Sequence, residues 1–178
     1  MQRIRLSRAA VTLLVFCALQ AVAQMPPPKP APELSKLDFL AGHWVTEGEL
    51  KPGPTGQGGK VTAIDDTEWM EGKFFLVMHS KFSGVAGDLT GLAIYGYDKK
   101  QQLYTFNSYN SAGEADHYTG TVDGDTITWS GSIAFGPQSL KTRYVQTKLS
   151  PTAYTYKFEV SPDGTNWVLV MDGKAAKK

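Results

Sequence analysis

Cysteine and histidine are scarce in this 178-residue chain. The single cysteine is Cys17, and the three histidines, His43, His79 and His117, are far apart. One cysteine excludes a disulfide within the chain and a thiolate zinc site, both of which need several. The histidines form no HExxH pattern. We therefore expect no bound metal and no cofactor.

Charge of one sign is also lacking. Eighteen Lys and Arg residues face seventeen Asp and Glu residues, which leaves a formal net charge of +1. Proteins that bind nucleic acid concentrate basic residues on one face or in runs. A nearly neutral chain without basic runs argues against a nucleic-acid partner.

The longest apolar run, Ala9 to Leu19, is too short for the ~20 residues that span a bilayer. Three arginines precede it, and the small-x-small sequence Ala21-Val22-Ala23 follows. This order is typical of a cleavable signal peptide over residues 1–23. We expect a periplasmic or secreted protein with no membrane span after cleavage. Cleavage would remove Cys17 and three of the four arginines and change the net charge from +1 to −2.

Motifs for covalent catalysis are missing. The chain has no GxSxG nucleophile elbow. Ser108, Asp116 and His117 have the residue types of a catalytic triad, but neighbours on a strand point to opposite faces of a sheet. Asp116 is therefore badly placed to orient His117. We expect no catalytic residue and no enzymatic activity.

Four carboxylates, Asp65, Asp66, Glu68 and Glu71, cluster near one predicted hairpin. Paired carboxylates are the machinery of glycosidases. Acidic residues close to a turn are more commonly solvated surface charges. We interpret this cluster as solvated turn charges.

The proline distribution divides the chain into segments. Five of the ten prolines lie in residues 24–32, which predicts an extended linker. A single domain is expected over 33–174 and a polar tail over 175–178. The domain begins with a short helix over 33–40, in which Leu34, Leu37 and Leu40 recur at helical spacing.

After this helix, short runs rich in β-branched and aromatic residues alternate with turn signals such as Asp123-Gly124 and Asp163-Gly164. Every connection is short, so consecutive strands pair antiparallel. We predict an all-β, antiparallel up-and-down barrel of eight to ten strands, with a two-sheet sandwich as the alternative. The expected strands are 43–51, 61–70, 73–83, 89–98, 102–110, 114–122, 125–134, 139–149, 152–161 and 166–172.

Residues 37–49, LDFLAGHWVTEGE, carry a family resemblance. The signature of a short helix, then Gly42, Trp44 and Gly48, resembles the opening of calycin-type barrels such as lipocalins, fatty-acid-binding proteins and nitrobindin-like proteins. With the segments 68–74 and 91–98 and the Asp163-Gly164-x-x-Trp167 hairpin, the chain is similar to a bacterial family of unknown function numbered 1579. The resemblance implies a calycin-like barrel over most of residues 34–172.

Nitrobindin-like proteins hold haem iron through a histidine on a late strand. This chain has no histidine after Tyr118, so that ligand has no counterpart here. His79 or His117 would have to replace it. We therefore expect no haem.

Arg143 is the one arginine that remains after signal cleavage. A planar guanidinium suits two-point capture of a carboxylate or phosphate. With Tyr144 or Tyr156 it would anchor the head group of a fatty-acid-like ligand. The resemblance implies a second role, because the first-strand Trp44 of such barrels packs against a late basic residue. The predicted ligand-binding residues are Arg143, Tyr144, Tyr156, His117 and Trp69.

These observations predict an exported, non-catalytic barrel that binds a small hydrophobic or amphipathic ligand. The aromatic residues are spread over nearly all the expected strands, which gives the interior a mixed lining if they point inward. The alternative is a structural or protein-interaction module of the cell envelope. An enzyme of unknown type is the third hypothesis.

Overall fold

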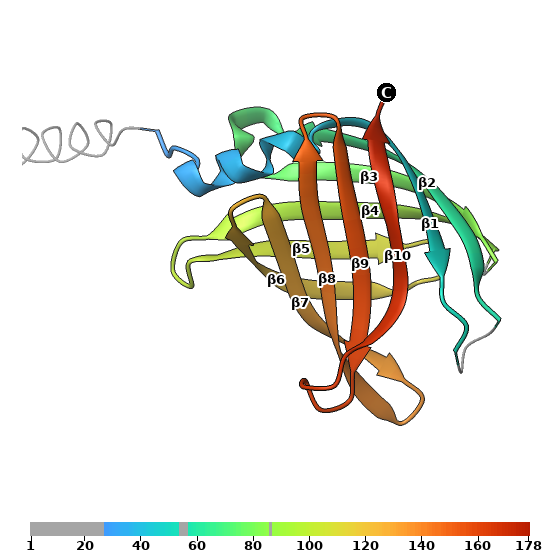
Figure 1. The fold of residues 1–178 in the computed structure, drawn as a ribbon. Helices are drawn as coiled ribbons and strands as arrows, with labels where there is room; N and C mark the ends of the chain where they lie inside the picture. Colours follow the sequence, from blue (N-terminus) through green and yellow to red (C-terminus); the bar gives the residue numbers. More distant parts are fainter. Residues whose placement is uncertain (1–26, 54–56, 86) are drawn as a thin grey trace, which may run out of the picture.

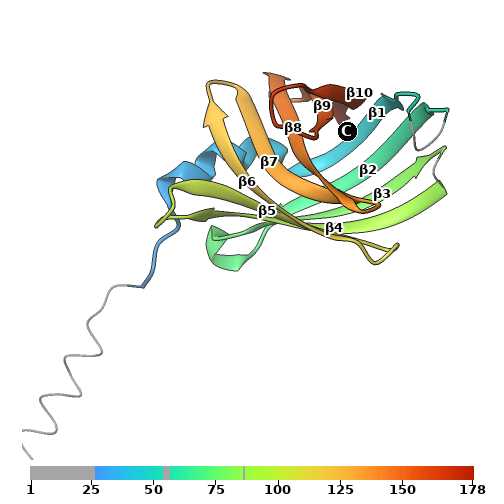
Figure 2. The same cartoon turned by 90° about the horizontal axis from the view of Figure 1, so that it is seen from below.

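The fold is a closed barrel of ten antiparallel strands in the computed structural model, which describes residues 27–53, 57–85 and 87–178. Each strand pairs with its sequence neighbours, and β1 pairs with β10 to close the ring (Figures 1 and 2). The predicted up-and-down barrel is confirmed, and the sandwich alternative is wrong. The strands are β1 (Gly42–Leu50), β2 (Gly59–Trp69), β3 (Leu76–Gly84), β4 (Gly87–Asp98), β5 (Leu103–Asn110), β6 (Ala115–Asp123), β7 (Thr126–Phe135), β8 (Gln138–Ser150), β9 (Ala153–Ser161) and β10 (Val168–Lys177).

All ten predicted strands exist, and two boundaries differ by more than two residues. β3 begins at Leu76 rather than residue 73, because the short 3₁₀ turn η2 (Glu71–Lys73) precedes it. Gly72 in this turn has φ 80°, a conformation that favours glycine. β10 continues to Lys177, where a tail was expected. It must do so to close the barrel, since Lys177 is the register partner of Trp44.

The predicted N-terminal helix is the 3₁₀ helix η1 (Pro32–Leu40). A 3₁₀ helix has three residues per turn, so side chains three apart lie on one face. Leu34, Leu37 and Leu40 have this spacing, and all three are buried. The leucine stripe therefore packs into the barrel as one continuous face.

η1 lies across one end of the barrel and is held there by polar contacts (Figure 1). The Lys177 ammonium on β10 donates a hydrogen bond to the Phe39 carbonyl of η1, at 3.3 Å. Three further side chains donate to η1: Trp44 Nε1 to the Leu40 carbonyl (2.9 Å), Trp69 Nε1 to Asp38 Oδ1 (3.0 Å) and the Tyr104 hydroxyl to the Glu33 carbonyl (2.9 Å). Because the donors come from the adjacent strands β10, β1 and β2 and from β5 further round the ring, η1 closes this end of the barrel.

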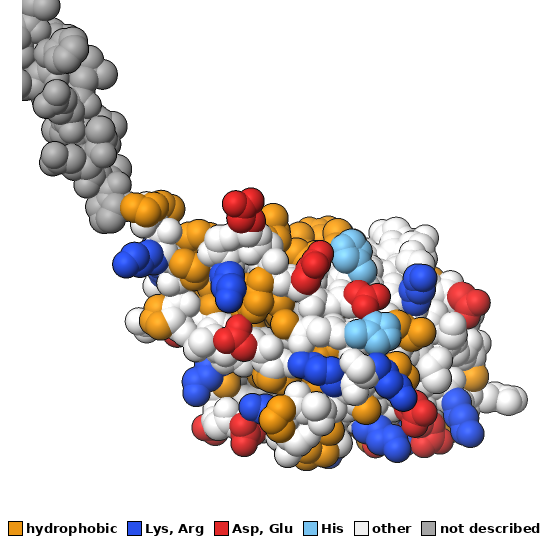
Figure 3. Space-filling view, turned by 90° about the horizontal axis from the view of Figure 1, so that it is seen from above, with side chains coloured by type: hydrophobic (Ala, Val, Ile, Leu, Met, Phe, Trp, Pro, Cys, Tyr) orange, Lys and Arg blue, Asp and Glu red, His pale blue; other side chains and the backbone are white. Residues whose placement is uncertain are grey.

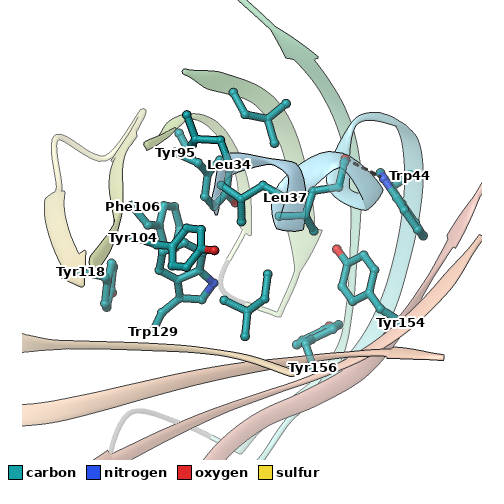
Figure 4. Close-up of a cluster of buried hydrophobic side chains, with 14 of the residues drawn as sticks. Leu34, Leu37, Trp44, Tyr95, Tyr104, Phe106, Tyr118, Trp129, Tyr154 and Tyr156 are labelled. Atoms are coloured by element: carbon teal, nitrogen blue, oxygen red, sulfur yellow. Dashed lines mark hydrogen bonds between the residues drawn. The ribbon is translucent and has the colours of Figure 1, made fainter. Parts of the chain in front are cut away.

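An aromatic cluster fills the interior next to η1 (Figure 4). Tyr95 stacks on Phe106 with ring centroids 4.7 Å apart, and Phe106 stacks on Tyr118 at 5.2 Å. Trp129 is fully buried against this stack. Each such aromatic pair adds about 1 kcal/mol beyond simple burial. The cluster makes this part of the interior solid.

Acidic and basic side chains are interspersed on the face of the molecule seen in Figure 3. That face carries no field of one sign that would attract a polyanion. Among the described residues, no helix is both long enough and apolar enough to cross a membrane.

The closure by η1 predicts a large cost for Leu37→Ala. Leu37 has no exposed surface, and truncation of a buried leucine leaves a cavity that costs about 3 kcal/mol. Urea denaturation followed by tryptophan fluorescence measures the change. The control is Leu149→Ala, because Leu149 is 63% exposed and its truncation is expected to cost no more than about 0.5 kcal/mol. Equal effects of the two substitutions would contradict the closing role of η1.

Candidate functional site

A cavity of about 240 Å³ lies inside the barrel, beside the aromatic cluster. Side chains that point inward from strands around the whole barrel line it, because alternate residues of each strand face the interior. An engineered cavity of about 150 Å³ already holds benzene. The space here therefore accommodates a molecule larger than benzene.

The lining changes character along the barrel axis. Asp65 pairs in register with Trp44, which binds η1, so Asp65 lies toward the closed end. Val61 lies nearer the hairpin between β1 and β2, at the other end of the strand. Along β1 and β2, the polar residues Thr46 and Asp65 therefore lie nearer the closed end than the apolar Val61 does. Other polar lining residues are Gln146 and Tyr154, and other apolar ones are Phe82, Phe158 and Met171.

Asp65 is a buried carboxylate with 8% of its surface exposed. Its Oδ2 accepts a hydrogen bond from Thr46 Oγ1 at 3.3 Å. Loss of hydration disfavours the charged form and raises the pKa of Asp65, while hydrogen bonds from Ser80 and Thr46 oppose this rise in part. No ion pair to Asp65 occurs among the described residues. Its charge is therefore weakly compensated inside the protein.

Gln146 is held in one orientation. Trp129 Nε1 donates to Gln146 Oε1 at 3.0 Å, and both side chains are buried. The bond occupies the amide oxygen and leaves the amide N–H groups for other partners. Burial raises the pKa of the neighbouring Tyr154 phenol, so Tyr154 stays neutral and keeps its hydroxyl proton.

The position of Tyr156 accounts for the absence of a side chain at Gly48 and Gly173. Its hydroxyl approaches the backbone so closely that a Cβ atom at Gly48 or Gly173 would collide with it. Gly48 belongs to the signature that we recognised in the sequence. The structure gives this residue a physical role, because the missing side chain makes room for a tyrosine of the cavity wall.

The predicted ligand-binding residues divide between the two faces of the barrel. Tyr144 and Tyr156 line the cavity. His117 is exposed on β6, with Nδ1 bonded to Asn107 Oδ1 across the strand pair. Trp69 binds η1 and does not line the cavity.

Arg143 lies on the outer face, because it alternates with the inward-facing Tyr144. Its Nε donates to Glu159 Oε2 at 2.8 Å, and its guanidinium carbon lies 4.4 Å from the ring centroid of Trp167. The expected stack of Arg143 on Trp44 is therefore wrong. A late basic residue does cover Trp44, but it is Lys177, whose Nζ lies 4.9 Å from the ring centroid.

Asp65 is the residue that the sequence interpretation missed. Treating it as a solvated turn charge is wrong, although Asp66 beside it is exposed and pairs with His43 at 2.6 Å. Alternation along β2 contains the signal. Asp65 is in phase with Val61 and Trp69, whereas Asp66 is in phase with Lys60 and Glu68.

The burial of Asp65 predicts that Asp65→Asn stabilises the protein at pH 7, by about 1 kcal/mol. The native pKa of Asp65 is raised, so the native state binds its proton more readily than the unfolded state, where the pKa is about 3.9. Wild-type stability therefore falls, relative to the variant, as pH rises from about 4 through the native pKa. Thermal melts from pH 3 to pH 8 measure the difference, and a gap that does not change with pH would contradict the account.

The outward placement of Arg143 predicts that Arg143→Lys has a small structural effect. Lysine cannot donate through a planar group to Glu159 while it stacks on Trp167. Because Arg143 keeps about a third of its side-chain surface exposed to solvent, the expected loss of stability is only about 0.5 kcal/mol. The melting temperature is expected to fall slightly, with ligand affinity unchanged. Lost affinity with an unchanged melting temperature would restore the anchoring role.

Comparisons with known proteins address the fold and the family. No match was found among the curated proteins. The chain is similar to a solved structure described as "Crystal Structure of Rv2717c from M. tuberculosis", with a TM-score of 0.58 and 18% identity, over 84% of this chain and 99% of that one. At this identity the likeness shows the fold alone. The family model described as "Protein of unknown function (DUF1579)" matches residues 29–177, and the chain therefore belongs to the DUF1579 family.

Proposed function

We propose that this protein is an exported, non-catalytic, calycin-like barrel that binds a small hydrophobic or amphipathic molecule. The observation that carries the proposal is the cavity of about 240 Å³ between the aromatic cluster and the open end. Small-molecule sites are typically concave and mostly apolar, with a few polar groups that orient the ligand. The lining has this composition.

A route to the cavity supports ligand entry. A second hollow at the surface is formed by β3, β4 and β5, and its residues include Leu89, Thr90 and Tyr109. The two spaces have several lining residues in common, so the cavity adjoins the surface hollow. The shared residues are Met78, Ser80, Phe82, Phe106, Ser108 and Met171.

The chemistry of the lining supports binding rather than catalysis. Acid–base catalysis usually needs two titratable groups with different tasks. Asp65 is the one carboxylate among the described lining residues, and no histidine, lysine or arginine is among them. Its hydrogen-bond partner Thr46 supplies a hydroxyl group, which is not a base that could activate a nucleophile. Export rests on the signal-like pattern of residues 1–23, which lie outside the described residues.

Filling the cavity with a larger side chain is expected to weaken binding strongly. The probe is N-phenyl-1-naphthylamine, an uncharged fluorophore whose emission rises in apolar surroundings. Ala63 lines the cavity, so Ala63→Phe should weaken probe affinity at least tenfold. Ile64→Phe is the matched control, because Ile64 is the next residue on β2, is 44% exposed and points outward.

Both variants need a native circular dichroism spectrum before the comparison counts. Equal affinity in wild type, Ala63→Phe and Ile64→Phe would place the probe elsewhere and contradict the proposal. Native mass spectrometry of the protein purified from its own cells then identifies the natural ligand, as extra mass that is lost on denaturation.

A further inference from the structure

The cavity contains one charged side chain, and its sign is negative. Among the described lining residues, Asp65 is the sole ionisable group other than tyrosines. The predicted anchor Arg143 and the basic residue that covers Trp44, Lys177, both lie elsewhere. Arg143 is bound to Glu159 on the outer face, and the Lys177 ammonium is bound to the Phe39 carbonyl beside Trp44.

Asp65 has unused capacity to accept hydrogen bonds. An ionised carboxylate has about four lone-pair positions on its two oxygens. The hydroxyls of Thr46 and Ser80 occupy part of this capacity. The cavity that Asp65 lines is otherwise made largely of aromatic and aliphatic side chains.

The free-energy cost of removing Asp65 from water arises when the protein folds and not when a ligand binds. An isolated buried carboxylate is unfavourable until it gains a partner. A hydrogen-bond donor that enters the cavity therefore gains a strong interaction with a group that is already dehydrated and fixed. A second carboxylate there meets like-charge repulsion in a medium that screens it poorly.

Position along the axis completes the argument. Asp65 lies toward the closed end, and the apolar residues Val61, Phe82 and Met171 lie between it and the open end. A ligand that enters polar end first places its apolar part against these walls. The arrangement matches one molecule with a donor at one end and a hydrocarbon body.

We infer that the cavity selects amphipathic molecules with a protonated amine, which binds Asp65 at the closed end, and that it rejects the matching carboxylates. This inference rests on the proposed function and names the ligand class of the same cavity. It differs from the fatty-acid-like ligand for which Arg143 was one predicted anchor, because Arg143 lies on the outer face of the barrel.

The test compares three molecules of nearly equal size and shape: 3-phenylpropylamine, 3-phenyl-1-propanol and 3-phenylpropanoate. Each displaces bound N-phenyl-1-naphthylamine at pH 7 in a titration, with the probe affinity measured separately for every protein. The wild type is expected to bind the amine at least tenfold more tightly than the carboxylate, with the alcohol between them.

Two variants isolate the role of Asp65. Asp65→Asn should lower the affinity for the amine at least fivefold. The affinities for the amine and the carboxylate should then lie within about threefold of each other. Asp66→Asn removes the same charge from the next residue of β2, on the outer face, where Asp66 pairs with His43. Asp66→Asn should leave the order of the three affinities, and the ratio of the amine affinity to the carboxylate affinity, as in the wild type. This result distinguishes direct contact with Asp65 from a general attraction of cations to the protein.

The outcomes distinguish the two proposals. Three outcomes overturn the inference and leave the binding function standing. The first is a carboxylate that binds as tightly as the amine, the second is a preference for the amine that survives Asp65→Asn, and the third is failure of all three molecules to displace a bound fluorophore. Failure of the fluorophore itself to bind the wild type contradicts the proposed function.

Discussion

The burial of the leucine stripe of η1 in one end of the barrel is the constraint on which the rest of the structure depends. A closed ring of ten strands has two open ends and an interior that its side chains must fill. Leu34, Leu37 and Leu40 fill one end, and side chains from several strands fasten the helix there. The aromatic cluster around Trp129 then packs beneath this closure. The remaining space lies toward the other end, where the candidate ligand cavity is found.

That cavity includes a group that opposes stability. A buried carboxylate without an ionic partner makes the native state less stable than an uncharged residue of the same shape would. Asp65 is held in place by hydroxyls alone, whereas the amide oxygen of the nearby Gln146 accepts a hydrogen bond from the buried Trp129. Residues that reduce stability without a structural purpose are candidates for function. This contrast between two buried polar groups directs the functional argument to Asp65.

Much of the fold could be predicted because each step rests on local chemistry. Short β-rich runs and tight turns predict strands that pair with their neighbours, and so many strands close on themselves to avoid free edges. The resemblance of residues 37–49, 68–74 and 91–98 to the family numbered 1579 agrees with the family match over residues 29–177. The end of β10 was missed because Ala175 and Lys177 look like a polar tail until the ring needs a partner for β1.

The candidate site was less predictable, for a reason visible in two pairs of neighbours. Arg143 precedes Tyr144 on β8, and Asp65 precedes Asp66 on β2. Residue type alone favours an arginine as the anchor and treats both aspartates as solvated. The sequence by itself determined the strands, the turns and the periodicity of the leucine stripe, because these depend on residues close together in the chain. The tertiary structure alone decided that Asp65 faces the cavity and Arg143 faces Trp167, because the inner face of a strand exists only once the ring has closed.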